Sequence, residues 1–397
     1  MTFLPTLFLL PTIWVVDAQM GPGAHFANLP AAIAAAANGD TILVRAGDYA
    51  PFSIQGKFVT IRGEGSTKTR ILGLPSGPAA RVDLPGGMTV ISGLRIEGGI
   101  PSLQLQNAAV ELLDCEVAGH SGFGEVGAAV VLLNTHCIAS RCTFQGGAAL
   151  GSAVSASGVT GQVNSTFLAD QCFMRGGDVV GPGSPIQLAG FGVWCLGRMR
   201  LDGCRVRGGA TSSGGGLGIG VGLGSTLRIV GDVTSYVAAG FGAGQTGMAL
   251  QNLSGTAFQN GPITLVGSVS GTLMPGPSLP RLRVVGTARA DGTLDALQSV
   301  QVTLDGLEPN GFGFVAFGDP VFAAPAPPFA SELLVGGAGA AVFVTALDAT
   351  GRAQFAYTPA LIGGPLVGVP VHLQGGAWSP VLGSVLTSNL AVHIAVP

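Results

Sequence analysis

Five short segments in the middle of the chain share a two-residue alternation of polar and apolar positions. Each has an apolar residue or Cys, a polar residue, an apolar residue, a polar or small residue, and then Gly. The segments begin at Leu94, Cys115, Cys142, Cys172 and Cys204. Since successive side chains of a strand point to opposite faces, each segment predicts a short strand with one face buried. The starts are 21, 27, 30 and 32 residues apart, a loose period typical of stacked structural repeats.

The repeats predict an all-β fold, a right-handed parallel β-helix. If each strand lies in register on the previous one, the first positions form an inward ladder with a spacing of about 4.8 Å. That spacing would permit disulfides between Cys115 and Cys142 and between Cys172 and Cys204. Parallel side chains seldom reach the torsion a disulfide needs, however, so we expect a buried stack of free thiols. The other two Cys lie outside the ladder, and the sequence predicts no pairing for them.

A short helix is predicted ahead of the coil, starting at Asn28. Asn28 suits the N-cap, Pro30 suits the first turn, an Ala run follows, and Asn38-Gly39 supplies a stop. Such a helix can cover the open end of a β-coil, which otherwise presents unpaired strand edges.

The run from Phe26 to Tyr49 resembles a known family. Its Ala-rich helix and the following Gly-Asp-Thr-Ile-Leu-Val-Arg-Ala-Gly-Asp-Tyr look like the opening of right-handed parallel β-helix proteins of the pectate-lyase-like superfamily, which includes pectin methylesterases. With the repeats, the resemblance covers about residues 13–270. It implies the coil fold and no particular activity, because the opening lies away from the family's catalytic rungs. The calcium-binding Asp clusters of its lyases and the paired Asp of its hydrolases have no recognisable counterpart, since no Asp-Asp pair occurs.

The chain divides into four parts by composition. Residues 1–12 are apolar and uncharged, and predict a signal segment whose cleavage could fall as late as residue 18. Residues 13–274 are the predicted coil and 275–281 a Pro-rich linker. About seven short strands predict an antiparallel β-sandwich over 282–397, similar to C-terminal modules of bacterial secreted proteins. We expect a location outside the cell or on its surface, and no transmembrane segment.

Composition excludes several classes of protein. With 47% hydrophobic and 10% charged residues, the chain is far from the signature of disorder, and its 66 Gly indicate many tight turns. A net charge of −3 argues against nucleic-acid binding. Because no Cys/His spacing suits zinc, we expect no metal and no cofactor, with Ca²⁺ entering only if the protein is a lyase.

The outward positions of the repeats provide the candidate binding residues. Arg side chains can pair bidentately with carboxylates of uronic acids or with sulfated glycans, although nearby Asp could neutralise them and leave a solvated face. The outward aromatic Phe173 is the best candidate for stacking. The candidate set is Phe173, Arg175, Arg205 and Arg207 on outward positions of the repeats, with Arg198 and Arg200 on the strand just before.

Candidates for catalysis are weaker. His120, Glu125 and His136 are close in sequence and could form an acid–base group, although a His beside Gly is more often simply exposed; Asp178 is a fourth candidate. We therefore expect a secreted, non-catalytic β-helix protein for surface structure, adhesion or binding of acidic polysaccharide or cell-envelope glycans. The alternative is a polysaccharide lyase or glycoside hydrolase that acts on uronate-containing glycans.

Overall fold

The structure is a computed structural model. It describes residues 11–396 except 85, 124, 151–154, 181–188, 212–214, 233, 243–244, 277–278, 286–293, 296–297, 307–310, 324–332, 359–369 and 380–383. Most of the predicted signal segment, residues 1–10, lies outside the described residues. Within the described part of the chain, no helix has the length and apolar character needed to cross a bilayer.

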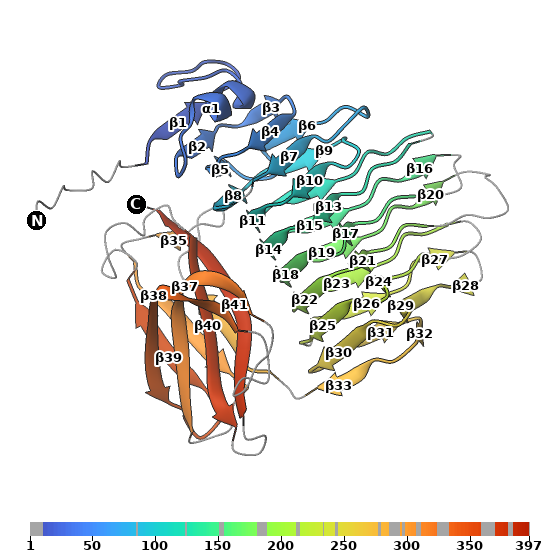
Figure 1. The fold of residues 1–397 in the computed structure, drawn as a ribbon, viewed down its shortest axis with the longest axis vertical. Coiled ribbons are helices and arrows are strands. Elements are labelled where there is room, and N and C mark those ends of the chain that lie inside the picture. The colour runs from blue at the N-terminus through green and yellow to red at the C-terminus, as the bar shows by residue number, and fades with distance from the viewer. Residues whose placement is uncertain are drawn as a thin grey trace, which may run out of the picture.

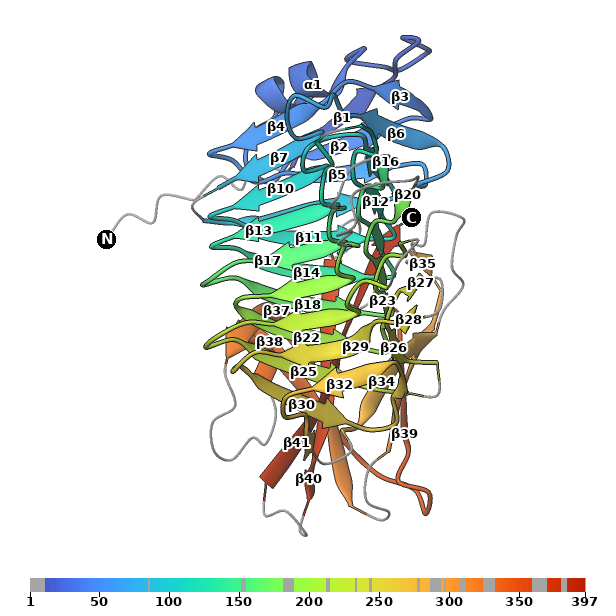
Figure 2. The same cartoon turned by 90° about the vertical axis from the view of Figure 1, so that its right-hand side faces the viewer.

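Three parallel sheets, named here A, B and C, wind around one core (Figures 1 and 2). Sheet A consists of β1 (Ile13–Val16), β2 (Thr41–Val44), β5 (Thr60–Gly63), β8 (Met88–Ser92), β11 (Ala109–Leu113), β14 (His136–Ser140), β18 (Thr166–Asp170), β22 (Arg198–Asp202), β25 (Thr226–Val230), β30 (Thr256–Asn260) and β33 (Met274–Gly276). Sheet B consists of β3 (Gly47–Tyr49), β6 (Thr69–Leu72), β9 (Arg95–Glu97), β12 (Glu116–Ala118), β15 (Thr143–Gln145), β19 (Phe173–Arg175), β23 (Arg205–Arg207), β26 (Tyr236–Ala238) and β31 (Thr264–Val266). Sheet C consists of β4 (Phe52–Gln55), β7 (Ala80–Asp83), β10 (Leu103–Gln106), β13 (Val130–Leu133), β17 (Val159–Gly161), β21 (Val193–Cys195), β24 (Ile219–Val221), β29 (Met248–Asn252) and β32 (Ser268–Ser270). Two small pairs lie on loops: β16 (Ala149–Leu150) with β20 (Val179–Val180), and β27 (Phe241–Gly242) with β28 (Gln245–Thr246).

The predicted right-handed parallel β-helix with an N-terminal helix is confirmed. Helix α1 (Leu29–Ala35) starts where expected, because the Asn28 side chain accepts a hydrogen bond from the amide of Ala31 at 2.9 Å. The helix ends before Asn38, and Lys57 Nζ donates to three carbonyl oxygens at its C-terminus, those of Ile33, Ala34 and Ala36. Leu29, Ala32 and Ile33 are buried against the coil.

Each Cys of the ladder lies at the corner between sheets A and B, one residue before its strand. The residue ahead of it has a left-handed backbone, with φ of 52° at Asp114, 53° at Arg141 and 54° at Gln171. The thiol then points inward and donates to two carbonyls; Cys142 Sγ is 3.4 Å from Leu112 O and 3.3 Å from Ser140 O. All six Cys are buried and free, so the expected stack of thiols is confirmed and the alternative disulfides are not formed.

A thiol titration without reductant checks this core. We expect six reactive thiols in denaturant, since no disulfide is present. The native protein should react very slowly at neutral pH, because burial raises the pKa of Cys195 to about 12 and that of Cys142 well above its ordinary value. Four or fewer thiols in the denatured protein would contradict the stack.

The C-terminal part is a two-layer sandwich, antiparallel except for one short parallel pair in its larger sheet, in agreement with the predicted antiparallel β-sandwich. One layer has three strands, β34 (Arg281–Val285), β36 (Val300–Asp305) and β39 (Ala353–Tyr357). The other has five, β35 (Leu294–Asp295), β41 (Ser384–Val396), β40 (Pro370–Ser379), β37 (Phe312–Ala323) and β38 (Leu333–Ala346). Since β33 ends at Gly276 and β34 begins at Arg281, the first residues of the predicted linker belong to the coil.

The sandwich packs with its five-stranded sheet on the outward face of sheet A (Figure 1). An apolar row on the coil, Val90, Ile138 and Leu168, and the adjacent Leu113 contact Ala316 and Val392 of the sandwich. Glu111 lies in this row between Val90 and Ile138, and His372 Nε2 is 3.1 Å from both of its carboxylate oxygens. The two side chains are 7% and 0% exposed, so the pair is sealed inside the contact.

Breaking this pair should destabilise the docked protein. The substitution His372→Ala leaves the buried Glu111 carboxylate uncompensated, and we expect it to lower the free energy of unfolding by about 3 kcal/mol. Replacement of both residues by Leu should restore most of this loss, because it leaves no buried charge. Denaturant unfolding followed by circular dichroism measures both changes. Wild-type stability in His372→Ala would mean that the sandwich does not dock as described.

Candidate functional site

The outward face of sheet B carries the candidate binding residues in two rows. Strands β19, β23 and β26 pair in register, so that Phe173, Arg205 and Tyr236 lie next to one another in the first row. Arg175 and Arg207 are neighbours in the second row. The alternation found in the sequence dictates this placement, because the intervening residues Met174 and Val206 are buried in the core.

The N-terminal half of the same face is neutralised by carboxylates. Arg70 and Arg95 each contact Glu97 at 2.6 Å, and Arg95 also lies 3.2 Å from Glu116. Burial alone would raise the pKa of Glu97, but hydrogen bonds from the two guanidinium groups and their charges lower it below the ordinary value. This half therefore presents paired charges.

Two Arg in the C-terminal half lie on aromatic rings instead. The guanidinium carbon of Arg205 is 5.8 Å from the centre of the Phe173 ring, and that of Arg207 is 5.1 Å from the centre of the Phe241 ring. Neither Arg has a carboxylate partner within the described residues. Arg175 differs from them, because it forms an ion pair with Asp178.

We call Phe173, Arg205, Arg207, Tyr236 and Phe241 the arginine site. Cation–π contacts restrict the two guanidinium groups while leaving N–H donors at their edges. Planar donors of this kind bind carboxylates and other oxyanions with two parallel hydrogen bonds. Arg205 is exposed and Phe241 is 48% exposed, so an extended ligand can reach the site from solvent.

Two of the predicted Arg lie elsewhere. Arg198 and Arg200 belong to β22 and project from sheet A, not from sheet B. Arg198 is exposed at the start of the strand, whereas Arg200 is 2% exposed, pairs with Asp202 at 2.9 Å and donates to Ser388 O of the sandwich. Arg200 is therefore closed off from solvent, because the docked sandwich covers part of sheet A.

The structure does not bring the catalytic candidates together. His120 and the exposed Glu125 lie on the loop from β12 to β13, while His136 begins β14, beyond the whole of β13. Burial lowers the pKa of His136. The Asp178 carboxylate forms an ion pair with Arg175 and accepts a hydrogen bond from the amide of Ala210 at 2.8 Å. It therefore fixes the start of a loop.

No group of three His, Cys, Asp or Glu side chains that could hold a metal ion occurs among the described residues. The expectation that the protein needs no cofactor stays a prediction.

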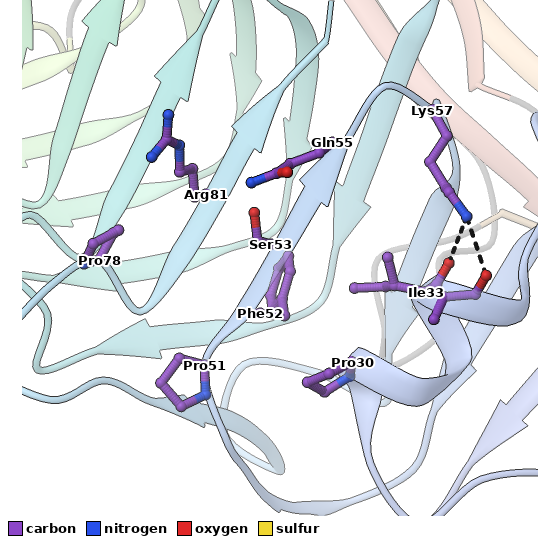
Figure 3. A pocket seen from close by; sticks show the side chains of 10 residues that line it. Pro30, Ile33, Pro51, Phe52, Ser53, Gln55, Lys57, Pro78 and Arg81 are labelled. Carbon is purple, nitrogen blue, oxygen red and sulfur yellow. Dashed lines mark hydrogen bonds between the residues drawn. The ribbon is translucent and has the colours of Figure 1, made fainter.

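A shallow groove of about 650 Å³ lies between α1 and the outward face of sheet C (Figure 3). It is lined by Pro30, Pro51 and Ser53 among others. Its two cations are already bonded, Lys57 to the helix carbonyls and Arg81 to Asp83 and Gln106. We therefore place the candidate site on sheet B and not in this groove.

Sequence reasoning missed two aromatic members of the arginine site. Tyr236 is the first residue of β26, and the buried Ser235 comes just before it. Ser235 thus has the position before β26 that Cys204 has before β23. The segment from Ser235 to Gly240 thus repeats the alternation with Ser in place of Cys, and this signal could have revealed Tyr236. Phe241 comes from the loop that follows, and no periodicity predicts its contact with Arg207.

No family model and no curated protein matches the chain. Among solved structures, pectin methylesterase PemA from Erwinia chrysanthemi is similar with 12% identity and a TM-score of 0.39, over 65% of this chain and 82% of that chain. A pectin methylesterase in complex with a hexasaccharide has 12% identity and a TM-score of 0.38 over the same shares. The enzymatically active domain of bacteriophage CBA120 tailspike protein 4 has 12% identity and a TM-score of 0.31, over 89% of this chain and 64% of that chain.

Proposed function

We propose that this protein is a secreted, non-catalytic β-helix that binds acidic polysaccharide through the arginine site. One observation carries the proposal: Arg205 and Arg207 are held on aromatic rings and have no carboxylate partner among the described residues. On the other half of sheet B, by contrast, Arg70 and Arg95 are neutralised by Glu97 and Glu116. Unpaired guanidinium groups at fixed positions favour a ligand that brings its own anionic groups.

The chemistry around the site suits binding better than bond cleavage. General acid–base catalysis needs a side chain that can reach the proton it transfers. The carboxylate of Asp178, which pairs with Arg175 of the second row, also accepts a hydrogen bond from the amide of Ala210 and is therefore already engaged. The uncharged segment at residues 1–12 supports secretion, and cell-envelope glycans are then the acidic polymers the site would meet.

Removing either unpaired Arg should weaken polysaccharide binding. We expect Arg205→Ala and Arg207→Ala each to lower the affinity for a uronate polymer about tenfold, since a hydrogen bond to a charged group contributes about 1.5 kcal/mol or more. Isothermal titration calorimetry against polygalacturonate and a sulfated glycan measures this loss. Binding should also weaken as salt is raised, because the site is exposed.

Arg70→Ala is the matched control, because Arg70 lies on the same sheet face but is paired with Glu97. It should leave the affinity within about twofold of wild type, and circular dichroism checks that all variants fold. If the wild-type protein binds no acidic polymer at low salt, the proposed function is wrong.

The alternative function, lyase or hydrolase action on uronate-containing glycans, has a direct test. We expect neither unsaturated products nor new reducing ends when the protein is incubated with such polymers and Ca²⁺. Product formation that is lost in Asp178→Asn or His120→Ala would establish the enzyme instead. Product formation retained in both variants would also show that the non-catalytic proposal is wrong.

A further inference from the structure

The groove between α1 and the outward face of sheet C has polar side chains along its floor. Ser53 and Gln55 are two residues apart on β4, so both project from the same face of the sheet. Ser53 pairs in register with Arg81 of β7, so these two residues are neighbours across the strands. All three side chains line the groove (Figure 3). We call Ser53, Gln55 and Arg81 the groove floor.

The groove floor has hydrogen-bonding groups that the protein itself does not use. Within the described residues, the exposed Ser53 hydroxyl and the exposed Gln55 amide have no hydrogen-bond partner. Arg81 donates to Asp83 and to Gln106, in both cases through Nη2. Its Nη1 is therefore free, and its Nε has no partner in the described part of the chain. The floor can thus donate to a ligand and accept from it.

The charges at the groove are already balanced. Arg81 Nη2 lies 3.2 Å from the Asp83 carboxylate. Lys57 donates to three carbonyl oxygens at the C-terminal end of α1, where the helix dipole favours a positive charge. The groove therefore has little attraction for an ion and suits an uncharged ligand, in contrast to the arginine site.

The walls of the groove are apolar and rigid. Pro30 and Ala34 of α1 form one side. Pro51 comes just before β4, and Pro78 comes just before β7. A proline ring loses almost no side-chain entropy when a ligand packs on it. The volume of about 650 Å³ is within the range of about 300–1,000 Å³ that is usual for ligand sites.

We propose that this groove is a second binding site, which takes an uncharged sugar chain. Sugar hydroxyl groups both donate and accept hydrogen bonds, as the Ser53 hydroxyl and the Gln55 amide do. The C–H faces of the sugar rings can pack on the proline walls. Hydroxyl groups are also closer together on a sugar than amide groups are on an extended peptide, which suits three polar side chains on two adjacent strands.

The groove and the arginine site lie on different faces of the coil. Strands β4 and β7 are at the N-terminal end of sheet C, whereas β23 and β26 are near the C-terminal end of sheet B. Ligands at the two sites therefore do not compete for the same residues. A chain with both sites can bridge an acidic polysaccharide and an uncharged one.

Isothermal titration calorimetry with four neutral hexasaccharides tests the proposal, using maltohexaose, cellohexaose, mannohexaose and xylohexaose. At least one should bind with a Kd below about 1 mM. Gln55→Ala should weaken this binding about fivefold, because one hydrogen bond between uncharged groups is lost. Ser53→Trp should abolish it by filling the groove. Raising the salt concentration should leave this binding unchanged, since no charge of the ligand is involved.

Gln251→Ala is the matched control. Gln251 belongs to the same outward row of sheet C as Ser53, at the far end of the sheet. Its replacement should leave the affinity for the neutral sugar unchanged. Thermal unfolding checks that the variants fold, and Arg81→Ala takes the place of Ser53→Trp if that variant does not fold.

Three results would overturn the proposal. One is that none of the four hexasaccharides binds at millimolar concentration. Another is that binding persists in both Gln55→Ala and Ser53→Trp, or that hexagalacturonate displaces the neutral sugar. The third is that an uncharged polyproline peptide binds in place of the sugars, which would make this a peptide groove. Arg205→Ala should keep the neutral sugar bound, so this proposal and the proposed function can fail separately.

Discussion

The corner between sheets A and B determines what the rest of the coil presents. A left-handed residue turns the chain, and the following Cys points inward and donates to carbonyls of its own rung and of the previous one. These hydrogen bonds fix the register of each strand on the strand before it, at the point where sheet B begins. Because strand side chains alternate, a slip of one residue would turn Arg205 and Arg207 inward and Val206 outward. The arginine site therefore exists only because the corner fixes the register.

The three faces of the coil have different roles, which follow from their charges. Sheet A carries an apolar row with one buried carboxylate, and the sandwich covers it. Sheet B changes along its length from Arg paired with Glu to Arg supported by aromatic rings. Sheet C faces the groove beside α1, where the cations are already bonded. Sheet B combines exposed Arg without a carboxylate partner and aromatic rings that support them, among the described residues.

Much of this architecture could be predicted from local patterns, but the relation between the domains could not. The alternation of polar and apolar residues after Cys204 predicts that Arg205 and Arg207 point outward. Asn28, as the N-cap residue, predicts where α1 begins. The same alternation places Arg200 outward as well, and it is buried because a domain nearly 200 positions later packs over it. Periodicity separates the core side of a strand from its outer side. It carries no information on which outer surface another domain covers, nor on loop residues such as Phe241.

The free thiols have a consequence for how the chain must mature. Once the coil has formed, its six Cys are enclosed and none is linked to another. Before that, all six are accessible, and an oxidising compartment would join them in pairs that the coil cannot accommodate. In such a compartment the native state would be reached only if the coil formed faster than the thiols oxidised. Folding speed, and not a set of covalent cross-links, would then protect the chain.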